Sequence, residues 1–114
     1  MEDLPPISDA FEPPYYAVIF TSQRTDTEGE PYASTAERMV ELAAEQDGFL
    51  GVESVRNPDG LGITVSYWST MEAIAVWRAQ SEHQQAQAKG RETWYAKYVV
   101  RVCKVERTYG FEMG

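Results

Sequence analysis

The sequence is poor in cysteine, histidine, basic residues and long apolar runs, and each shortage excludes a class of protein. The one cysteine, Cys103, cannot form an internal disulfide, and with one histidine, His83, a metal site is not expected. Ten Lys and Arg against 18 Asp and Glu give a net charge of −8, which disfavours binding to nucleic acid or to an anionic membrane. No apolar run approaches the ~20 residues that cross a bilayer, and the N-terminus has neither the basic nor the apolar part of a secretory signal. We therefore expect a cytoplasmic protein.

The first 14 residues differ in composition from the rest of the chain. They hold four of the six prolines and four acidic residues without a base, which predicts an extended acidic arm over residues 1–14. The remaining residues, 15–114, suffice for one domain and are too few for two. We therefore predict a single domain preceded by this arm.

The segment GLGITVSYWSTMEAIAVW, which ends at Trp77, changes its hydrophobic period from two to about 3.6. Its alternating apolar residues up to Trp68 predict a strand. The tetrapeptide STME, which starts at Ser69, has the form of a capping box and predicts a helix start. The strand therefore ends where the helix begins, and it carries the aromatic pair Tyr67 and Trp68 at that end.

The same signals predict the other elements. β-Branched and aromatic runs predict strands near both ends of the domain, and the turn sequence NPDG predicts a hairpin. The tetrapeptide STAE, which starts at Ser34, predicts a helix that ends before Gly48. The predicted elements are a strand over 15–21, a helix from Ser34, strands over 49–56 and 61–68, a helix from Ser69, a weakly patterned helical segment from Ser81 and a strand over 98–107.

The predicted order βαββαβ is that of a ferredoxin-like domain, an α+β fold whose antiparallel sheet is covered on one face by its helices. The first strand nevertheless has apolar residues on both sides, since Tyr16, Val18 and Phe20 alternate with Ala17 and Ile19. Burial of apolar surface contributes ~25 cal/mol per Å². Covering several hundred square ångströms of the second face would therefore stabilise a complex by on the order of 10 kcal/mol before association costs. We therefore predict a homodimer packed sheet to sheet. The alternative is that the acidic arm or the third helical segment folds over the second face.

Three longer stretches carry a family resemblance: TAERMVELAAEQDGFLGVESVR, GITVSYWSTMEAIAVWR and EHQQAQAKGRETWYAKYVVRVCKVERTYGF. The most specific parts are GFLGV followed by a hairpin and YW-S-x-x-E-A-x-x-x-W, and the pattern EH-x-x-AQ-x-x-GR-x-x-WY-x-x-Y. The chain from Tyr15 to Phe111 resembles the antibiotic biosynthesis monooxygenase domain, in particular its uncharacterised bacterial members. The resemblance implies a dimeric α/β barrel with a cavity between each sheet and its helices. It also implies an oxidoreductase, because members include oxygenases of aromatic polyketides that use no metal or flavin, quinol oxygenases and haem-degrading enzymes.

A cofactor-free oxygenase needs an apolar pocket in which a phenol or quinol is deprotonated, so that the anion passes an electron to oxygen. His83, with an ordinary pKa of about 6.5, suits the general base, although a lone histidine is also common at helix starts and on surfaces. Trp68 matches the strand-end tryptophan of the family. We predict His83 and Trp68 as catalytic residues; for Trp68 and Trp77 the alternative is packing in the core.

Five further residues are predicted to bind the substrate. Arg91 can hold an oxyanion or a carboxylate, or form a salt bridge with one of the many acids. The resulting prediction is a monooxygenase that uses no cofactor and acts on a small aromatic compound. The alternative is a non-enzymatic dimeric domain that binds a small molecule or is related to the stress response. The predicted substrate-binding residues are Tyr67, Trp77, Arg91, Trp94 and Tyr95.

Haem degradation fits the sequence less well. The haem-degrading members carry an asparagine in the first strand and a histidine ligand in the helix after the second tryptophan. These positions fall near Phe20 or Thr21 and near Ala88. His83 lies about five residues too early, which is more than one helical turn. Only Trp68 of the three functional positions is retained, so we do not expect haem binding.

Overall fold

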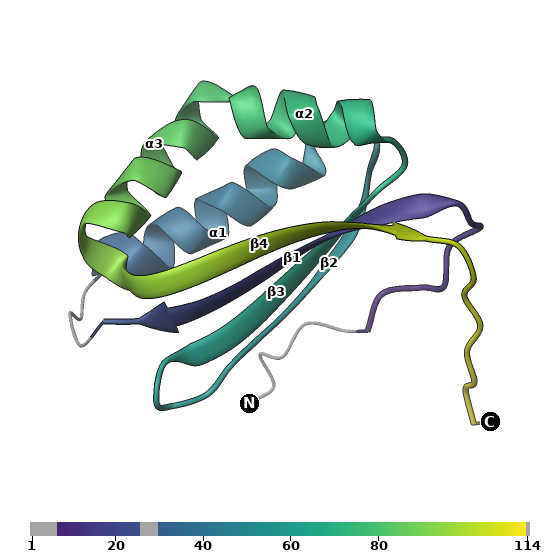
Figure 1. Cartoon of the computed structure of the whole chain (residues 1–114), viewed down its shortest axis with the longest axis horizontal. Coiled ribbons are helices and arrows are strands. Elements are labelled where there is room, and N and C mark those ends of the chain that lie inside the picture. The colour runs from purple at the N-terminus through teal and green to yellow at the C-terminus, as the bar shows by residue number, and fades with distance from the viewer. Residues whose placement is uncertain (1–6, 26–29, 114) are drawn as a thin grey trace.

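The computed structural model describes residues 7–25 and 30–113 and consists of one sheet with all its helices on one face (Figure 1). The predicted ferredoxin-like α+β fold is confirmed. Of the helices among the described residues, none is long and apolar enough to cross a membrane. The elements are β1 (Tyr15–Arg24), α1 (Glu30–Ala44), β2 (Phe49–Arg56), β3 (Leu61–Trp68), α2 (Met71–Ala79), α3 (Ser81–Lys89), a π-helical turn η1 (Gly90–Trp94) and β4 (Tyr95–Val105).

The sheet has the strand order β2-β3-β1-β4, and all neighbouring strands are antiparallel. β1 and β2 both run against β3, which lies between them, so the unit β1-α1-β2 is a split βαβ arrangement. In the register of β1 and β3, Tyr16 is opposite Trp68, and Ala17 is opposite Tyr67. Because successive side chains of a strand alternate between faces, Trp68 and Tyr67 lie on opposite faces of the sheet.

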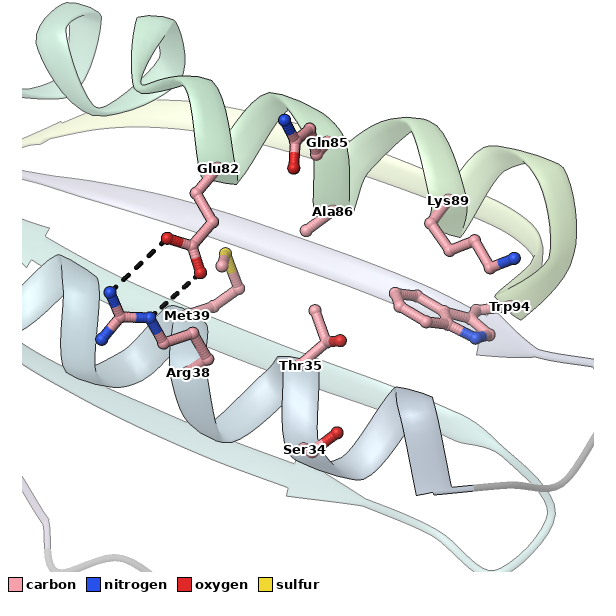
Figure 2. A pocket seen from close by; sticks show the side chains of 9 residues that line it. All are labelled: Ser34, Thr35, Arg38, Met39, Glu82, Gln85, Ala86, Lys89 and Trp94. Carbon is pink, nitrogen blue, oxygen red and sulfur yellow. Dashed lines mark hydrogen bonds and ion pairs between the residues drawn. The ribbon is translucent and has the colours of Figure 1, made fainter.

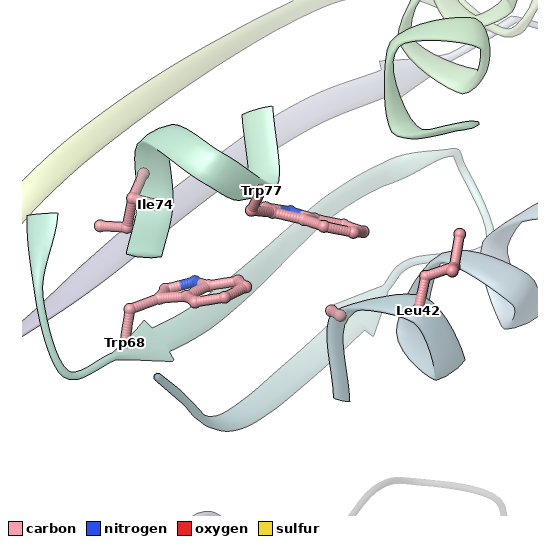
Figure 3. Close-up of a cluster of buried hydrophobic side chains, with 5 residues drawn as sticks. Leu42, Trp68, Ile74 and Trp77 are labelled. Carbon is pink, nitrogen blue, oxygen red and sulfur yellow. The ribbon is translucent and has the colours of Figure 1, made fainter. Parts of the chain in front are cut away.

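The helix-covered face of the sheet contains the core. Trp68 is fully buried at the end of β3, and α1 and α2 pack around it (Figure 3). The two helices contribute small and branched apolar side chains together with a second indole. Burial of a Leu side chain at this depth contributes ~1.5–3 kcal/mol to the stability of the fold. The buried residues of this cluster are Leu42, Ala43, Trp68, Ile74 and Trp77.

The helices begin one or more residues away from their predicted starts. α1 begins at Glu30 rather than Ser34, and a proline in its first turn costs no hydrogen bond, because the first amides of a helix have no partner within it. The N-cap of α2 is Thr70, whose Oγ1 accepts a hydrogen bond from the Ala73 amide at 3.0 Å. The N-cap of α3 is Gln80, not Ser81. The terminal strands also differ, since β1 continues to residue 24 and β4 covers 95–105 instead of 98–107.

Gly48 allows the turn between α1 and β2 to approach the start of α2 closely. It has φ +88°, in the left-handed region that favours glycine, and a Cβ atom added there would lie 2.7 Å from Cβ of Ala73. Its carbonyl accepts a hydrogen bond from the Ser69 amide at 2.8 Å. The glycine of the turn that follows α1 is therefore the contact point for the start of α2.

The second face of the sheet is covered at one end by residues 7–14, which form neither helix nor strand (Figure 1). The Ser8 amide donates a hydrogen bond to Oε2 of Glu53 at 2.9 Å, and the Tyr67 hydroxyl donates one to Oε1 at 2.7 Å. The Phe11 ring meets the Tyr15 ring edge to face, with 5.6 Å between centroids. The acidic arm thus covers part of this face, as the alternative to the dimer supposed; residues 1–6 lie outside the described residues.

The other end of this face remains exposed. Three apolar side chains next to the β2–β3 hairpin are open to solvent: Val55 is 61% exposed, Leu61 45% and Ile63 48%. We call Val55, Leu61 and Ile63 the hairpin patch. The sheet therefore has one face buried under helices and another on which an apolar end is left uncovered.

Candidate active site

An open cavity of about 420 Å³ lies between α1 and α3 (Figure 2). We call it the interhelical cavity. Its volume falls within the roughly 300–1,000 Å³ of typical small-molecule sites. On α3 the lining residues recur at the spacing of one helix face, and Trp94 of η1 closes one end. The lining residues are Ser34, Thr35, Arg38, Met39, Glu82, Gln85, Ala86, Lys89 and Trp94.

The charged residues of the cavity lie at its two ends (Figure 2). At one end Nε of Arg38 donates a hydrogen bond to Oε2 of Glu82 at 3.0 Å, and the carboxylate raises the pKa of the guanidinium. At the Trp94 end Nζ of Lys89 is 4.0 Å from Oε1 of Glu92, a looser and exposed pair. The cavity therefore presents a neutralised ion pair at one end and a weakly paired cation at the other, with the Met39 and Ala86 side chains between them.

Trp68, Trp77 and His83 form a continuous stack of rings. The two indoles have centroids 6.0 Å apart and planes inclined by 27°, and the imidazole lies 4.1 Å from the Trp77 ring at 12°. Rings at these separations are in direct contact, so no ligand fits between them. The indole N–H of Trp68 donates to Oγ of Ser66 at 2.9 Å and needs no other acceptor. The space bounded by these three residues is thus filled by their own rings.

The position of the proton on His83 follows from its hydrogen bond. Nδ1 lies 2.9 Å from the carbonyl oxygen of Trp77, and because a carbonyl can only accept, Nδ1 carries the proton and Nε2 keeps a lone pair. Burial lowers the pKa of His83, and the Arg78 charge adds to this, while the bond to Trp77 opposes it. His83 directly follows Glu82 and precedes Ala86 by three residues, and both of these line the cavity. His83 itself is not among the lining residues, so a neutral base of fixed tautomer lies on the helix that lines the cavity, with its ring packed on Trp77.

A second group of aromatic rings supports the Trp94 end. Trp94 is buried, and Tyr32 meets it edge to face with 5.4 Å between centroids. The Tyr95 hydroxyl donates to the Tyr32 hydroxyl at 3.2 Å, and burial raises the pKa of Tyr95, so it stays protonated at neutral pH. The guanidinium carbon of Arg24 lies 3.6 Å from the Tyr32 ring centroid, as in a cation–π contact. Phe20 packs on Tyr95 at 5.3 Å.

The predicted site residues fall into three places. Trp68 and Trp77 stack with His83, whereas Trp94 and Tyr95 belong to the second group. Arg91 is exposed beside them and donates a hydrogen bond to the Tyr98 hydroxyl at 3.3 Å. Tyr67 lies on the other face of the sheet, bonded to Glu53, and does not share a pocket with Trp68.

Sequence reasoning missed the ion pair of Arg38 with Glu82, as well as Lys89 and Tyr32. The spacing of Glu82, Gln85, Ala86 and Lys89 is the one signal that marks a common helix face. Among residues 7–25 and 30–113, no three or more His, Cys, Asp and Glu side chains are grouped to hold a metal ion.

Comparison with known proteins places this chain in a family. A sequence profile described as "Antibiotic biosynthesis monooxygenase" matches residues 15–89. The chain is 58% identical over 106 residues to the uncharacterised protein YqjZ of Bacillus subtilis, which covers 93% of this chain and 92% of that protein. It is 29% identical over 94 residues to a jasmonate monooxygenase of Pyricularia oryzae, with 79% of this chain and 43% of that protein covered, so it spans less than half of the fungal protein.

Among solved structures, the fold is similar to that of SnoaB, a cofactor-independent oxygenase of Streptomyces nogalater. The TM-score is 0.69 at 16% identity, and the match covers 84% of this chain and 97% of SnoaB. This likeness concerns the fold, whereas the profile match extends over more than half of the sequence. The chain therefore belongs to the antibiotic biosynthesis monooxygenase family.

Proposed function

We propose that this protein is a monooxygenase that oxidises a small, electron-rich aromatic compound of the phenol or quinol type without an added cofactor. Membership of the family supports the reaction type, as do the names of the fungal jasmonate monooxygenase and of SnoaB. The observation that carries the proposal is His83, whose Nδ1 is bonded to the Trp77 carbonyl so that Nε2 keeps a lone pair, on the helix whose Glu82 and Ala86 line the interhelical cavity. On the basis of the sequence we place this activity in the cytoplasm.

In this proposal the substrate ring lies against Trp94 and Met39, and its hydroxyl proton moves to Nε2 of His83. The anion gives an electron to O₂. At a ring carbon that bears two hydrogens, as in an anthrone, one oxygen atom becomes the carbonyl and the other leaves as water with the two hydrogens. The substrate then supplies all the electrons. Trp68 acts through Trp77, whose ring and carbonyl hold the imidazole, and is a positioning residue.

Oxygen uptake with anthrone-like and quinol substrates tests the proposal. Replacing Ala86, which lines the cavity, with Leu fills the site and should lower kcat/KM, whereas Ala88→Leu at an exposed position of the same helix should not. His83→Gln should lower kcat by about 10²–10⁴-fold, the usual contribution of a general base. Wild-type protein that consumes no oxygen with any substrate, or an Ala86→Leu variant as active as wild type, would contradict it.

One observation favours a second candidate, a binding domain without catalysis. The space between Trp68, Trp77 and His83 is filled by their rings, as expected of a packed core. In that case the cavity still binds an aromatic ligand, and Ala86→Leu weakens its binding, but no oxygen is consumed. Calorimetric titration beside oxygen uptake separates the two candidates.

We further propose that the protein is a homodimer that packs through the second face of its sheet. The exposed hairpin patch supports this, because apolar patches of this kind commonly mark interfaces. Leu61→Glu should dissociate the dimer in sedimentation experiments. Val76→Glu is the matched control, since Val76 is 62% exposed on the helical layer. A wild-type monomer at micromolar concentration would contradict the proposal.

A further inference from the structure

We propose that the substrate of the interhelical cavity carries a carboxylate and that Lys89 binds it. The proposal rests on the monooxygenase function proposed above and narrows its substrate to an aromatic acid, with a hydroxyl at one end of the ring system and the carboxylate at the other. It also gives a role to Lys89, which lines the cavity but takes no part in the proposed proton transfer. Lys89 is then a residue that determines substrate specificity.

The side chains that line the cavity carry one uncompensated positive charge. Arg38 and Glu82 are both lining residues, and they neutralise each other across a hydrogen bond of 3.0 Å. Lys89 also lines the cavity, whereas the carboxylate nearest to it, that of Glu92, does not. The whole chain has a net charge of −8, so the cavity has the opposite sign. A local positive charge of this kind favours a ligand with one negative charge.

The ion pair of Lys89 with Glu92 is weak enough for a ligand to compete with it. Nζ of Lys89 and Oε1 of Glu92 are 4.0 Å apart, which is beyond hydrogen-bond distance, and the two side chains are 51% and 73% exposed. Exposed pairs of this kind contribute little to stability, because water screens both charges. A ligand carboxylate that reaches the ammonium group can therefore take the place of Glu92.

The two charged ends of the cavity are separated by an apolar middle in which a fused ring system can lie. Glu82 and Lys89 are both on α3, about 10 Å apart along the helix axis, and Ala86 lies between them. The buried Trp94 ring lies at the Lys89 end (Figure 2). His83 follows Glu82 in the chain, so the hydroxyl that loses its proton in the proposed reaction belongs at the other end. The carboxylate of the substrate is then held at Lys89, far from the reacting hydroxyl.

Lys89 also lies in the last turn of α3, where a cation stabilises the carbonyl end of the helix. That role is structural and is the same for a charged and for an uncharged ligand. The two roles are therefore separated by a comparison of ligands that differ in charge and share their rings.

Calorimetric titration of the full chain with 6-hydroxy-2-naphthoate and with its methyl ester tests the proposal. Wild type should bind the acid about tenfold more tightly than the ester, the lower end of what a hydrogen bond to a charged group contributes. Lys89→Met keeps the apolar stem and should abolish this preference without changing the Kd of the ester. The matched control is Lys104→Met, which removes an exposed lysine near the far end of β4 and should keep the preference. Glu92→Gln removes the competing carboxylate and should tighten binding of the acid by up to about fivefold.

The possible results separate this proposal from the proposed reaction. Wild type that binds acid and ester equally, or a Lys89→Met variant that keeps the preference, overturns the role of Lys89 and leaves the oxidation of neutral phenols standing. A Lys89→Met variant that weakens the binding of acid and ester alike also overturns it, because such a loss is structural. Oxygen uptake with phenols and quinols of either charge is measured beside the titration. No uptake by a wild type that prefers the acid overturns the monooxygenase and leaves the carboxylate site in place.

Discussion

Replacing Tyr67 with Phe tests whether the hydrogen bond that holds Glu53, the residue to which the arm is bonded, contributes to stability. The change removes the 2.7 Å hydrogen bond to Oε1 of Glu53 and keeps the ring contacts with Phe11 and Tyr15. Hydrogen bonds to a charged partner contribute about 1.5–3 kcal/mol. Tyr67 is half-buried, and Glu53 keeps its bond from Ser8, so we expect the lower end, about 1.5–2 kcal/mol.

Urea unfolding at neutral pH measures this loss, and amide exchange at Ser8 reports on the arm. Tyr98→Phe is the matched control, because the Tyr98 hydroxyl accepts a 3.3 Å bond from the exposed Arg91; its effect should stay within about 0.5 kcal/mol. If Tyr67→Phe changes the free energy of unfolding no more than this control does, the reasoning about the hydrogen bond to Glu53 is wrong.

The same bond predicts a dependence on alkaline pH. Burial, and then the hydrogen bond to Glu53, raise the pKa of Tyr67 from 10.0 to about 12. The unfolded chain therefore loses this proton first as the pH rises. The stabilisation is complete below pH 10 and is lost between pH 10 and about 12. The Tyr67→Phe variant should lose less stability than wild type over this window.

Three other predictions concern the helix-covered face. Trp68→Ala should lower the free energy of unfolding in urea by about 3–5 kcal/mol, because a fully buried indole is removed; a loss below about 1 kcal/mol would contradict its place in the core. The lowered pKa of His83 means that stability is complete above pH 6.5 and falls as the pH drops from 6.5 to the folded-state pKa; His83→Gln should abolish this slope in thermal melts. Gly48→Ala should cost at least about 1–2 kcal/mol through left-handed strain alone, whereas Gly110→Ala, whose new Cβ meets nothing within 4 Å, should be neutral in the same assay.

The sequence predicted β2 and β3 to the residue because their signals are local. Alternation, the NPDG turn and the flanking glycine and capping residues all lie within the hairpin. The helix caps were displaced because neighbouring Ser, Thr and Gln side chains can all accept the amide bonds of a first turn, and the choice among Ser69, Thr70 and their neighbours depends on tertiary contacts. The continuation of β1 to residue 24 depends on pairing with β4, which no local pattern reveals.

Of the predicted site residues only Trp94 lines the interhelical cavity, and the positions of the others depend on the packing of the layers. The alternation of side chains along a strand places Tyr67 and Trp68 on opposite faces of the sheet. It does not say which of the two faces the helices. The contacts that decide this are distant in sequence. Ser8 is bonded to Glu53 on one face, and on the other face the bond of Arg38 to Glu82 joins the two helices that line the cavity. Such contacts depend on how the layers pack, so no pattern of a few residues reports them.

The basicity of His83 is a property of the core rather than of its immediate neighbours in sequence. The imidazole is held by the ring and the carbonyl of Trp77, and Trp77 in turn rests on the fully buried Trp68. Packing that stabilises the fold therefore also desolvates the one histidine, lowers its pKa and directs the Nε2 lone pair away from the backbone. Trp68 therefore contributes both to the stability of the fold and, through Trp77, to the position of His83. A change in Trp68 should alter the free energy of unfolding and, in the proposed reaction, the rate of proton transfer together. In the proposed reaction this coupling is how Trp68, which does not line the interhelical cavity, would affect proton transfer to His83.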